Sequence, residues 1–485
     1  MNVTVLYVGS SLLAPLKNAE REINRVYDLD LRVAAYNFGS PLNDGEWRDV
    51  DRDLSQANVV FVIHVMDGEN ASRLVTALES YQPDAVVVIN CMPDLMRLTR
   101  MGKLDVGKFA GWMGRYVKSE KKDRKHRHHH YLKLIDRLPT ILKFVPTAGA
   151  LTDAKHYLYL FCYFLQPTPA NIQSMLLYSL KHYVRDDRLR AVKTSTPQQV
   201  RSVAVYHPDA RELFETFEAY EKWHKSKKKK PLDPDSTLGL LLMRPQVVSK
   251  TTKHYDALIH AIEDEGLSVI PAIATLMDNR EAVSKFFHNG SKQISQIISL
   301  TGFSFVGGPA MNDSAAASQF LSDLNLPYRS AVSLDTQTIE AWRDSATGLN
   351  PIQAGMQIAI PEIDGATEPF IYGGIPVKGH EPTPLDDRCR RFARRLKRWN
   401  NLQTSPRDEV KLAIVLFCFP PNKGNIGTAA DLDVFPSVWD LLQRLEREGY
   451  RVEVPATADE LRERLLGGNS EQYGAAANVD YRMTV

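Results

Sequence analysis

Residues 58–90, NVVFVIHVMDGENASRLVTALESYQPDAVVVIN, contain two apolar runs separated by a helical pattern. The runs at 58–65 and 84–90 are almost continuously apolar, which is typical of strands buried on both faces of a parallel sheet. Two similar runs, VTVLYV and LRVAAYNF, lie upstream with an amphipathic stretch between them. Strands that alternate with helices in this way predict an α/β domain with a doubly wound sheet in residues 1–115.

The same alternation of strands and helices returns twice further along the chain. Residues 201–381 combine apolar runs such as TLGLLLMR and LSVIPAI with helical patterns, and predict a second parallel sheet of about four or five strands. Residues 411–485 begin with the apolar run 411–419, continue through a loop and a helical pattern to a strand at 450–455, and then stop. We therefore expect several doubly wound α/β domains, about three for this length, with the third cut short.

The segments between these α/β patterns differ from them in composition. Residues 116–130 are basic and rich in histidine, and we interpret them as a solvated linker because consecutive histidines cannot all face one metal ion. Residues 131–200 show helical periodicity and predict a helical segment that joins the first two domains. Residues 382–410 contain RCRRFARRLKRWNN and predict a basic helical connector.

Charge and apolar patterning limit the possible partners and the compartment. The net charge is +2, which gives no electrostatic reason to expect nucleic acid as a partner. The longest apolar runs are shorter than the ~18–20 residues that a membrane-spanning helix needs. The four cysteines form no CxxC pair, and the N-terminus lacks a basic region before its short apolar run. These features predict a soluble cytoplasmic protein with no membrane span.

Several motifs that carry well-known chemistry are absent from the sequence. It contains no GxxxxGK[ST], GxGxxG, HExxH or GxSxG pattern, so we do not expect this chain to hydrolyse ATP itself. The glycine-rich stretch 422–427, NKGNIG, follows a predicted strand and precedes a predicted helix. Its backbone amides can either hold an anion or cap the helix, and the spacing alone favours neither.

Residues 356–374, MQIAIPEIDGATEPFIYGG, form the most suggestive stretch for chemistry. We expect an apolar strand at 358–361 that ends in a turn carrying Glu362, Asp364 and Glu368. Three carboxylates this close together can coordinate a hard cation such as Mg²⁺, and one of them can act as a general base. A solvated or helix-capping acidic turn is the alternative.

Four stretches in this order, MDGENASRLVTAL, FVGGPAMNDS, IAIPEIDGATEPFIYGGIP and IVLFCFPPNKGNIGTAADLDVFPSVWDLL, resemble the large subunit of magnesium chelatase, known as its H subunit. The resemblance covers essentially the whole chain. The large subunit of aerobic cobaltochelatase is also similar, but the continuation TEPFIYGG favours the magnesium enzyme. Members of this family are considerably longer, so the chain resembles their N-terminal part.

The resemblance implies a porphyrin-binding subunit that inserts Mg²⁺, as the substrate ion, into protoporphyrin IX on the route to chlorophyll or bacteriochlorophyll. It also implies two partner subunits of the ATPase type, I and D, which use the ATP. Glu362, Glu368 and Asp364 occupy the family's acidic motif, and we expect them to be catalytic residues and metal ligands, with Glu362 the first choice. The residues that contact the porphyrin are left unassigned.

Two other functions stay open at this point. One is a non-catalytic fragment that binds a tetrapyrrole or regulates the ATPase partners. The other is a cobaltochelatase large subunit that acts on a corrin precursor.

Overall fold

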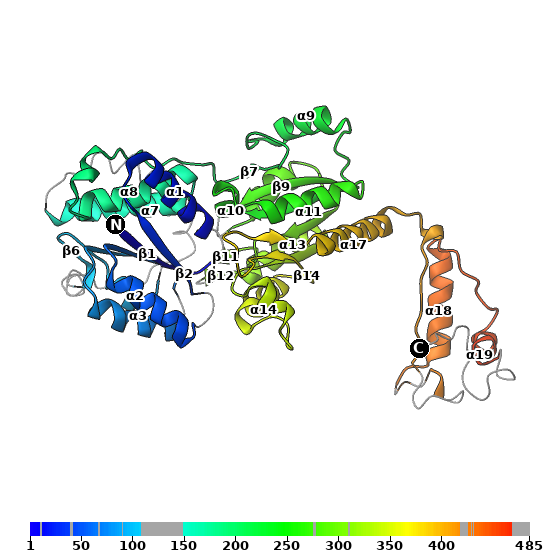
Figure 1. Cartoon of the computed structure of the whole chain (residues 1–485). Coiled ribbons are helices and arrows are strands. Elements are labelled where there is room, and N and C mark those ends of the chain that lie inside the picture. Colours follow the sequence, from blue (N-terminus) through cyan, green and yellow to red (C-terminus); the bar gives the residue numbers. More distant parts are fainter. Residues whose placement is uncertain are drawn as a thin grey trace, which may run out of the picture. The chain divides into compact units, whose positions relative to one another are not determined.

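The structure is a computed structural model of the whole chain, and it divides into two compact units, Met1–Lys397 and Arg398–Val485. Within its described residues, the first unit contains two large β-sheets and one two-stranded sheet (Figure 1). The residues that the structure describes are 1–9, 12–38, 42–65, 68–89, 91–107, 149–274, 278–308, 311–417, 425–427, 429 and 431–467. The linker predicted at 116–130 lies outside the described residues.

Within the described residues, the first sheet has six strands in the order β2-β1-β3-β4-β5-β6. The strands are β1 (Asn2–Tyr7), β2 (Arg32–Asn37), β3 (Val59–Ile63), β4 (Ala85–Ile89), β5 (Arg100–Met101) and β6 (Leu104–Asp105). The first four pair in parallel, and β5 and β6 add a short antiparallel edge. Every residue of β3 and β4 is buried, which confirms the prediction of a doubly wound parallel sheet.

Helices cover both faces of the first sheet, as Figure 1 shows. The helices are α1 (Leu13–Tyr27), α2 (Asp44–Ser55), α3 (Gly68–Ser80), α4 (Pro93–Met96), α7 (Ala150–Leu165), α8 (Pro169–Tyr183) and a short 3-10 helix at Asp187–Ala191. One core cluster packs α1, α7 and α8 against the sheet, and the other packs α2 and α3. The predicted helical segment therefore contributes α7 and α8 to the cover of this sheet.

Within the described residues, the second sheet has seven strands in the order β15-β14-β13-β10-β8-β9-β7. The strands are β7 (Ala204–Val205), β8 (Thr237–Met243), β9 (Ser268–Ala274), β10 (Gln296–Ser299), β13 (Tyr328–Leu334), β14 (Thr367–Gly374) and β15 (Thr383–Pro384). The five central strands are parallel, as the sequence predicted, and β7 and β15 are antiparallel edges.

The second sheet also has helices on both faces. The helices are α9 (Phe217–Lys228), α10 (Arg244–Val248), α11 (Lys253–Asp264), α12 (Arg280–Ala282), a π-helix (Val283–Phe287), α13 (Ser314–Leu324), α14 (Ile339–Arg343), α15 (Pro351–Ala354), a second π-helix (Gly355–Ala359), α16 (Ile360–Ile363) and α17 (Asp386–Thr404). A small hairpin, β11 (Gly307–Gly308) with β12 (Met311–Asn312), follows β10. One core cluster contains α11 and α17, and the other contains α9, α12 and α13.

The prediction of a strand at 358–361 is wrong. These residues are helical, and the strand β14 comes after the acidic turn. Asn350 caps the helical stretch through its side chain, and Pro351 occupies the first turn. The buried positions are Gln353, Gln357 and Pro361, spaced four residues apart as on one face of a helix. The apolar run alone did not reveal the helical conformation of residues 358–361, because a short apolar run fits a helix and a strand equally well.

The second glycine of the TEPFIYGG motif is required by a close approach between two strands. A Cβ on Gly374 would lie 2.5 Å from the Cβ of Leu334 on the neighbouring strand β13, and 3.0 Å from the backbone nitrogen of Leu334. We expect Gly374→Ala to lower the free energy of unfolding by ~2–3 kcal/mol because the two strands must separate. Denaturant titration of the purified chain measures this change.

Gly355 provides the matched control for Gly374. Its backbone is helical and no atom lies within 4 Å of the place that an added methyl group would take, so Gly355→Ala is expected to raise the free energy of unfolding by ~0.5–1 kcal/mol. A Gly374→Ala variant as stable as the unsubstituted chain would contradict the role of this close approach.

The second unit contains the helices α18 (Val434–Arg447) and α19 (Ala458–Leu466). The prediction of strands at 411–419 and 450–455 is wrong for the described residues, because 411–417 and 450–455 are not strands in the structure. A strand requires a neighbouring strand to pair its backbone N–H and C=O groups. The Gly427 N–H donates to the Phe417 carbonyl at 3.1 Å, but the sheets formed by the described residues include no strand of this unit. The apolar side chains of Val415 and Phe417 are accordingly 89% and 71% exposed. Most of the 422–427 loop lies outside the described residues.

Candidate functional site

The three carboxylates of the acidic motif lie in three different environments. Glu362 is exposed on α16, Asp364 is buried directly after that helix, and Glu368 is half-buried in β14. Asp364 and Glu368 each bind a different set of protein groups. The structure therefore does not bring the three side chains together around one point.

The Asp364 side chain ties the acidic motif to the loop that follows β10. Its Oδ2 atom accepts hydrogen bonds from the Ser304 hydroxyl and from the backbone N–H of Phe305, both at 2.7 Å. The residue is fully buried. Two hydrogen bonds to one buried carboxyl oxygen fix the loop at Ser304 and Phe305, so Asp364 stabilises the conformation of this loop.

Glu368 neutralises a buried arginine. Arg329 on β13 has a side chain that is only 1% exposed, and its Nε lies 2.7 Å from Oε2 of Glu368. Arg395 on α17 approaches the other carboxylate oxygen at 3.7 Å, and Gln296 on β10 accepts a hydrogen bond from Nη1 of Arg329 at 2.7 Å. Glu368 also has a left-handed backbone, φ 50°, beside a register shift between β13 and β14. The ion pair between Arg329 and Glu368 therefore stabilises a strained backbone conformation at this point of the sheet.

Glu362 is the carboxylate of the motif that faces solvent. It lies on α16, which directly continues the π-helix Gly355–Ala359, and π-helical turns are frequent at functional sites. The segment leads into β14, whose residue Thr367 pairs with Arg329 near the start of β13. The acidic motif consequently lies at the amino ends of these strands.

The opposite, carboxyl edge of the second sheet is where ligands usually bind in doubly wound folds. Asp335 follows β13 there, and burial raises its pKa to about 6, although hydrogen bonds from Gln353 and Gln357 partly offset the effect. His254 on α11 is fully buried, and burial lowers its pKa to about 3. Its ring stacks on Tyr372 of β14 with a centroid distance of 5.7 Å. A carboxyl group that titrates near neutral pH can exchange protons at this edge.

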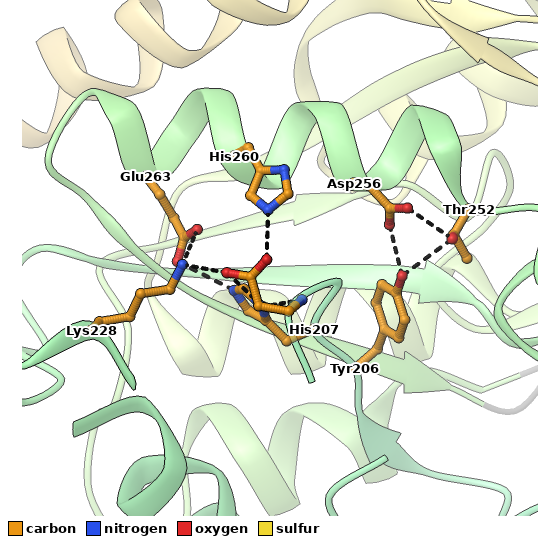
Figure 2. A network of polar contacts seen from close by, with 8 residues as sticks. Tyr206, His207, Lys228, Thr252, Asp256, His260 and Glu263 are labelled. Carbon is orange, nitrogen blue, oxygen red and sulfur yellow. Dashed lines mark hydrogen bonds and ion pairs between the residues drawn. The ribbon is translucent and has the colours of Figure 1, made fainter. Parts of the chain in front are cut away.

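A second polar cluster joins the turn after β7 to the helices α9 and α11, and is drawn in Figure 2. Nε2 of the buried His207 lies 3.2 Å from Oε1 of Glu263, and the ammonium of Lys228 contacts both Glu263 Oε2 at 2.9 Å and Asp209 Oδ2 at 2.8 Å. His260 Nε2 approaches the other oxygen of Asp209 at 3.1 Å. The hydrogen bond from Lys228 is the main cause that lowers the pKa of Asp209 to about 2.

A neighbouring set of hydrogen bonds fixes the start of α11 (Figure 2). The hydroxyl of Tyr206 donates to Asp256 Oδ1 at 2.7 Å, and Thr252 donates to the other oxygen of Asp256 at 3.1 Å. Burial raises the pKa of Asp256, and these two hydrogen bonds oppose the effect. Together with the His207 cluster, they attach both ends of α11 to residues 206–209.

These residues were not predicted as site residues, although the sequence contains a weak signal for some of them. His260 and Glu263 have the i,i+3 spacing that places two potential ligands on one helical face. Asp335 directly follows the short apolar stretch AVSL, 331–334, and the carboxyl end of a buried strand is a common position for functional groups. Nothing local connects Lys228 to this group, because it is one of several lysines in the lysine-rich stretch 225–230.

The fold and these polar clusters describe a doubly wound α/β protein with ionisable groups on its second sheet. A family model described as CobN/Magnesium Chelatase matches residues 161–484. A model described as Domain of unknown function (DUF3479) matches residues 2–158. The chain therefore belongs to the CobN/magnesium chelatase family, which confirms the resemblance found in the sequence.

Three curated relatives show how far the similarity extends. The magnesium-chelatase H subunit of Cereibacter sphaeroides is 32% identical over 451 residues, covering 88% of this chain and 37% of that protein. The chloroplastic magnesium-chelatase subunit ChlH of Oryza sativa subsp. japonica is 33% identical over 502 residues, covering 100% of this chain and 36% of that protein. The aerobic cobaltochelatase subunit CobN of Sinorhizobium sp. is 28% identical over 245 residues, covering 48% and 19%. The chain spans about a third of the length of the two magnesium-chelatase subunits.

Across the described part of the chain, none of the helices combines the length and the apolar character needed to cross a membrane.

Proposed function

We propose that this chain belongs to the porphyrin-binding large subunit of a magnesium chelatase, which inserts Mg²⁺ into protoporphyrin IX. The observation that carries the proposal is the extent of similarity. The magnesium-chelatase subunits match 88% and 100% of the chain, whereas the cobaltochelatase subunit matches 48% at lower identity. This comparison supports the choice of Mg²⁺ as the metal and of protoporphyrin IX as the macrocycle, and a cytoplasmic location stays a prediction.

The reaction makes two chemical demands on the protein. Two pyrrole protons must leave the macrocycle, and Mg²⁺, which loses its water reluctantly, must be partly dehydrated. Glu362 is our candidate for the proton acceptor because its carboxylate is exposed, while those of Asp364 and Glu368 are bound within the fold. We assign Asp364 and Glu368 to positioning the segment that carries Glu362.

The proposal assigns ATP hydrolysis to partner subunits of the I and D type. The sequence has no GxxxxGK[ST] motif to hold the phosphates of a nucleotide. A division of labour in which this chain holds the macrocycle and the partners hydrolyse ATP is consistent with that absence.

A fluorescence-quenching titration tests whether this chain binds a porphyrin. Deuteroporphyrin, a soluble analogue of protoporphyrin, is titrated with the purified 485-residue chain. We expect saturable quenching in the micromolar range. A folded chain that gives no quenching would contradict the placement of the porphyrin site within these residues.

The second candidate is insertion of cobalt into a corrin precursor, which the similarity to the CobN subunit favours. Both reactions are assayed with the I and D subunits and ATP, comparing Mg²⁺ with Co²⁺ and protoporphyrin with hydrogenobyrinic acid diamide. Turnover of Mg²⁺ with protoporphyrin supports the first function. Porphyrin binding without any ATP-dependent insertion would instead restrict this chain to a binding role.

A further inference from the structure

We propose that His207, Asp209, His260 and Glu263 form a binding site for a transition-series divalent cation of the Zn²⁺ type, and that the ammonium of Lys228 occupies its centre in the metal-free protein. The site is separate from the acidic motif, and this inference goes beyond the proposed chelatase function.

The donor atoms already lie close together. One ligand atom from each of His207, Asp209 and Glu263 can be chosen so that all lie within 4.8 Å of one another. His260 adds a fourth donor, with its Nε2 at 3.1 Å from Asp209 Oδ1. The His260 and Glu263 side chains share one face of α11 (Figure 2). Asp209 lies two residues after His207 in the sequence. Two short sequence pairs, brought together by the sheet, therefore supply two imidazoles and two carboxylates.

Lys228 shows that the cluster attracts a cation. Its Nζ lies 2.8 Å from one carboxylate and 2.9 Å from the other, so it bridges Asp209 and Glu263 as a bound cation would. The lysine is the last residue of α9, and its side chain is 26% exposed. A flexible ammonium at a helix end can move into solvent when a metal ion takes its place.

The ring of His207 is held in a fixed orientation beside Glu263. Its Nδ1 accepts the backbone N–H of Asp209 at 3.1 Å, which leaves Nε2 directed at Glu263. The ring is fully buried and lies against Trp223, with a centroid distance of 4.7 Å. A metal ion at Nε2 displaces the proton of Nε2, so the ring then carries its remaining proton on Nδ1 and gives up the hydrogen bond from Asp209.

The types of donor select the kind of metal. Imidazole suits Zn²⁺, Co²⁺ and Ni²⁺, whereas Mg²⁺ prefers oxygen ligands in an octahedral arrangement. Four donors from two histidines and two carboxylates match the usual coordination number of Zn²⁺. Binding would release Lys228, and with it the end of α9, from α11. The site would therefore couple the metal to the position of the lysine-rich stretch 225–230.

The experiment is a Zn²⁺ titration by competition with a chromophoric chelator. The sequence contains a second group of histidines that would bind Zn²⁺ nonspecifically, so the background protein carries alanine at His126, His128, His129 and His130. We expect this background protein to bind one Zn²⁺ per chain and Mg²⁺ at least ~100-fold more weakly. In the same background, Lys228→Met is expected to tighten Zn²⁺ binding at least ~10-fold, because no ammonium competes with the metal. The control Lys225→Met removes an exposed lysine of the same helix and should leave the affinity unchanged.

Two ligand variants decide the assignment. His260→Ala alters a half-exposed side chain and should leave the fold intact, while weakening Zn²⁺ binding at least ~10-fold. His207→Ala should weaken it further, with circular dichroism as the check on folding. Zn²⁺ binding that neither histidine variant changes, or no binding in the background protein and its Lys228→Met variant, would overturn the proposal. The assay contains no porphyrin and no partner subunit, so its result is independent of the proposed chelatase activity.

Discussion

Replacing Glu362 by glutamine is expected to lower the rate of ATP-dependent Mg²⁺ insertion by at least ~100-fold, the usual size of a lost general base. Glutamine keeps the length and shape of the side chain but cannot accept a proton from the macrocycle. Porphyrin affinity should stay within a few-fold, because the exposed carboxylate contributes little to the fold or to the binding of an apolar ring. Insertion is followed by the fluorescence of Mg-protoporphyrin with the I and D subunits present, and affinity by quenching.

Glu281→Gln is the matched control for this prediction, since Glu281 is also an exposed glutamate on a short helix of the second sheet's cover. It should leave both insertion and porphyrin affinity unchanged. Normal turnover in Glu362→Gln would remove Glu362 from the catalytic role. A large loss of porphyrin affinity would instead assign Glu362 to binding.

Replacing Glu368 by alanine is expected to lower the free energy of unfolding by ~3 kcal/mol, because the guanidinium of Arg329 is left buried without its carboxylate. The partly exposed Arg395 cannot replace that carboxylate, since it carries the same charge as Arg329. Denaturant titration followed by circular dichroism measures the change. A Glu368→Ala variant that unfolds like the unsubstituted chain would contradict the structural role.

Two further variants test why Glu368→Ala lowers the free energy of unfolding. Glu381→Ala removes a carboxylate that pairs with the mostly exposed Lys253, and such exposed pairs contribute less than ~1 kcal/mol. The double variant Arg329→Met with Glu368→Ala removes both charges without restoring the volume of Glu368, and should recover part of the stability that Glu368→Ala loses. Recovery in the double variant would show that the buried charge of Arg329 without the Glu368 carboxylate, rather than lost packing, causes the effect.

These two predictions assign different roles to two carboxylates for which the sequence predicted the same role, with Glu362 as the first choice. Glu362 and Glu368 belong to one acidic motif, and both were expected to be catalytic and to bind the metal. The structure gives Glu368 a buried arginine as partner and leaves Glu362 exposed. Their assignment to different roles is therefore a proposal that depends on the geometry and that the two variants test.

The sequence by itself determined the class of fold. The apolar runs of β3 and β4 are buried at every position, and the helices between strands carry the amphipathic period, so each segment encodes its own secondary structure. The four motif stretches also determined the family. Prediction failed at 358–361, because a short apolar run does not distinguish a helix from a strand when the buried face consists of Gln353, Gln357 and Pro361.

Only the tertiary structure decided which side chains meet. Arg329 and Glu368 are 39 residues apart, and His207 and Glu263 are 56 residues apart, so no local period connects either pair. Their contacts depend on the strand order and on the helices packed against the sheet. The physical reason is that backbone periodicity depends on neighbouring residues, whereas the pairing of charges depends on which distant segments the folded core brings together.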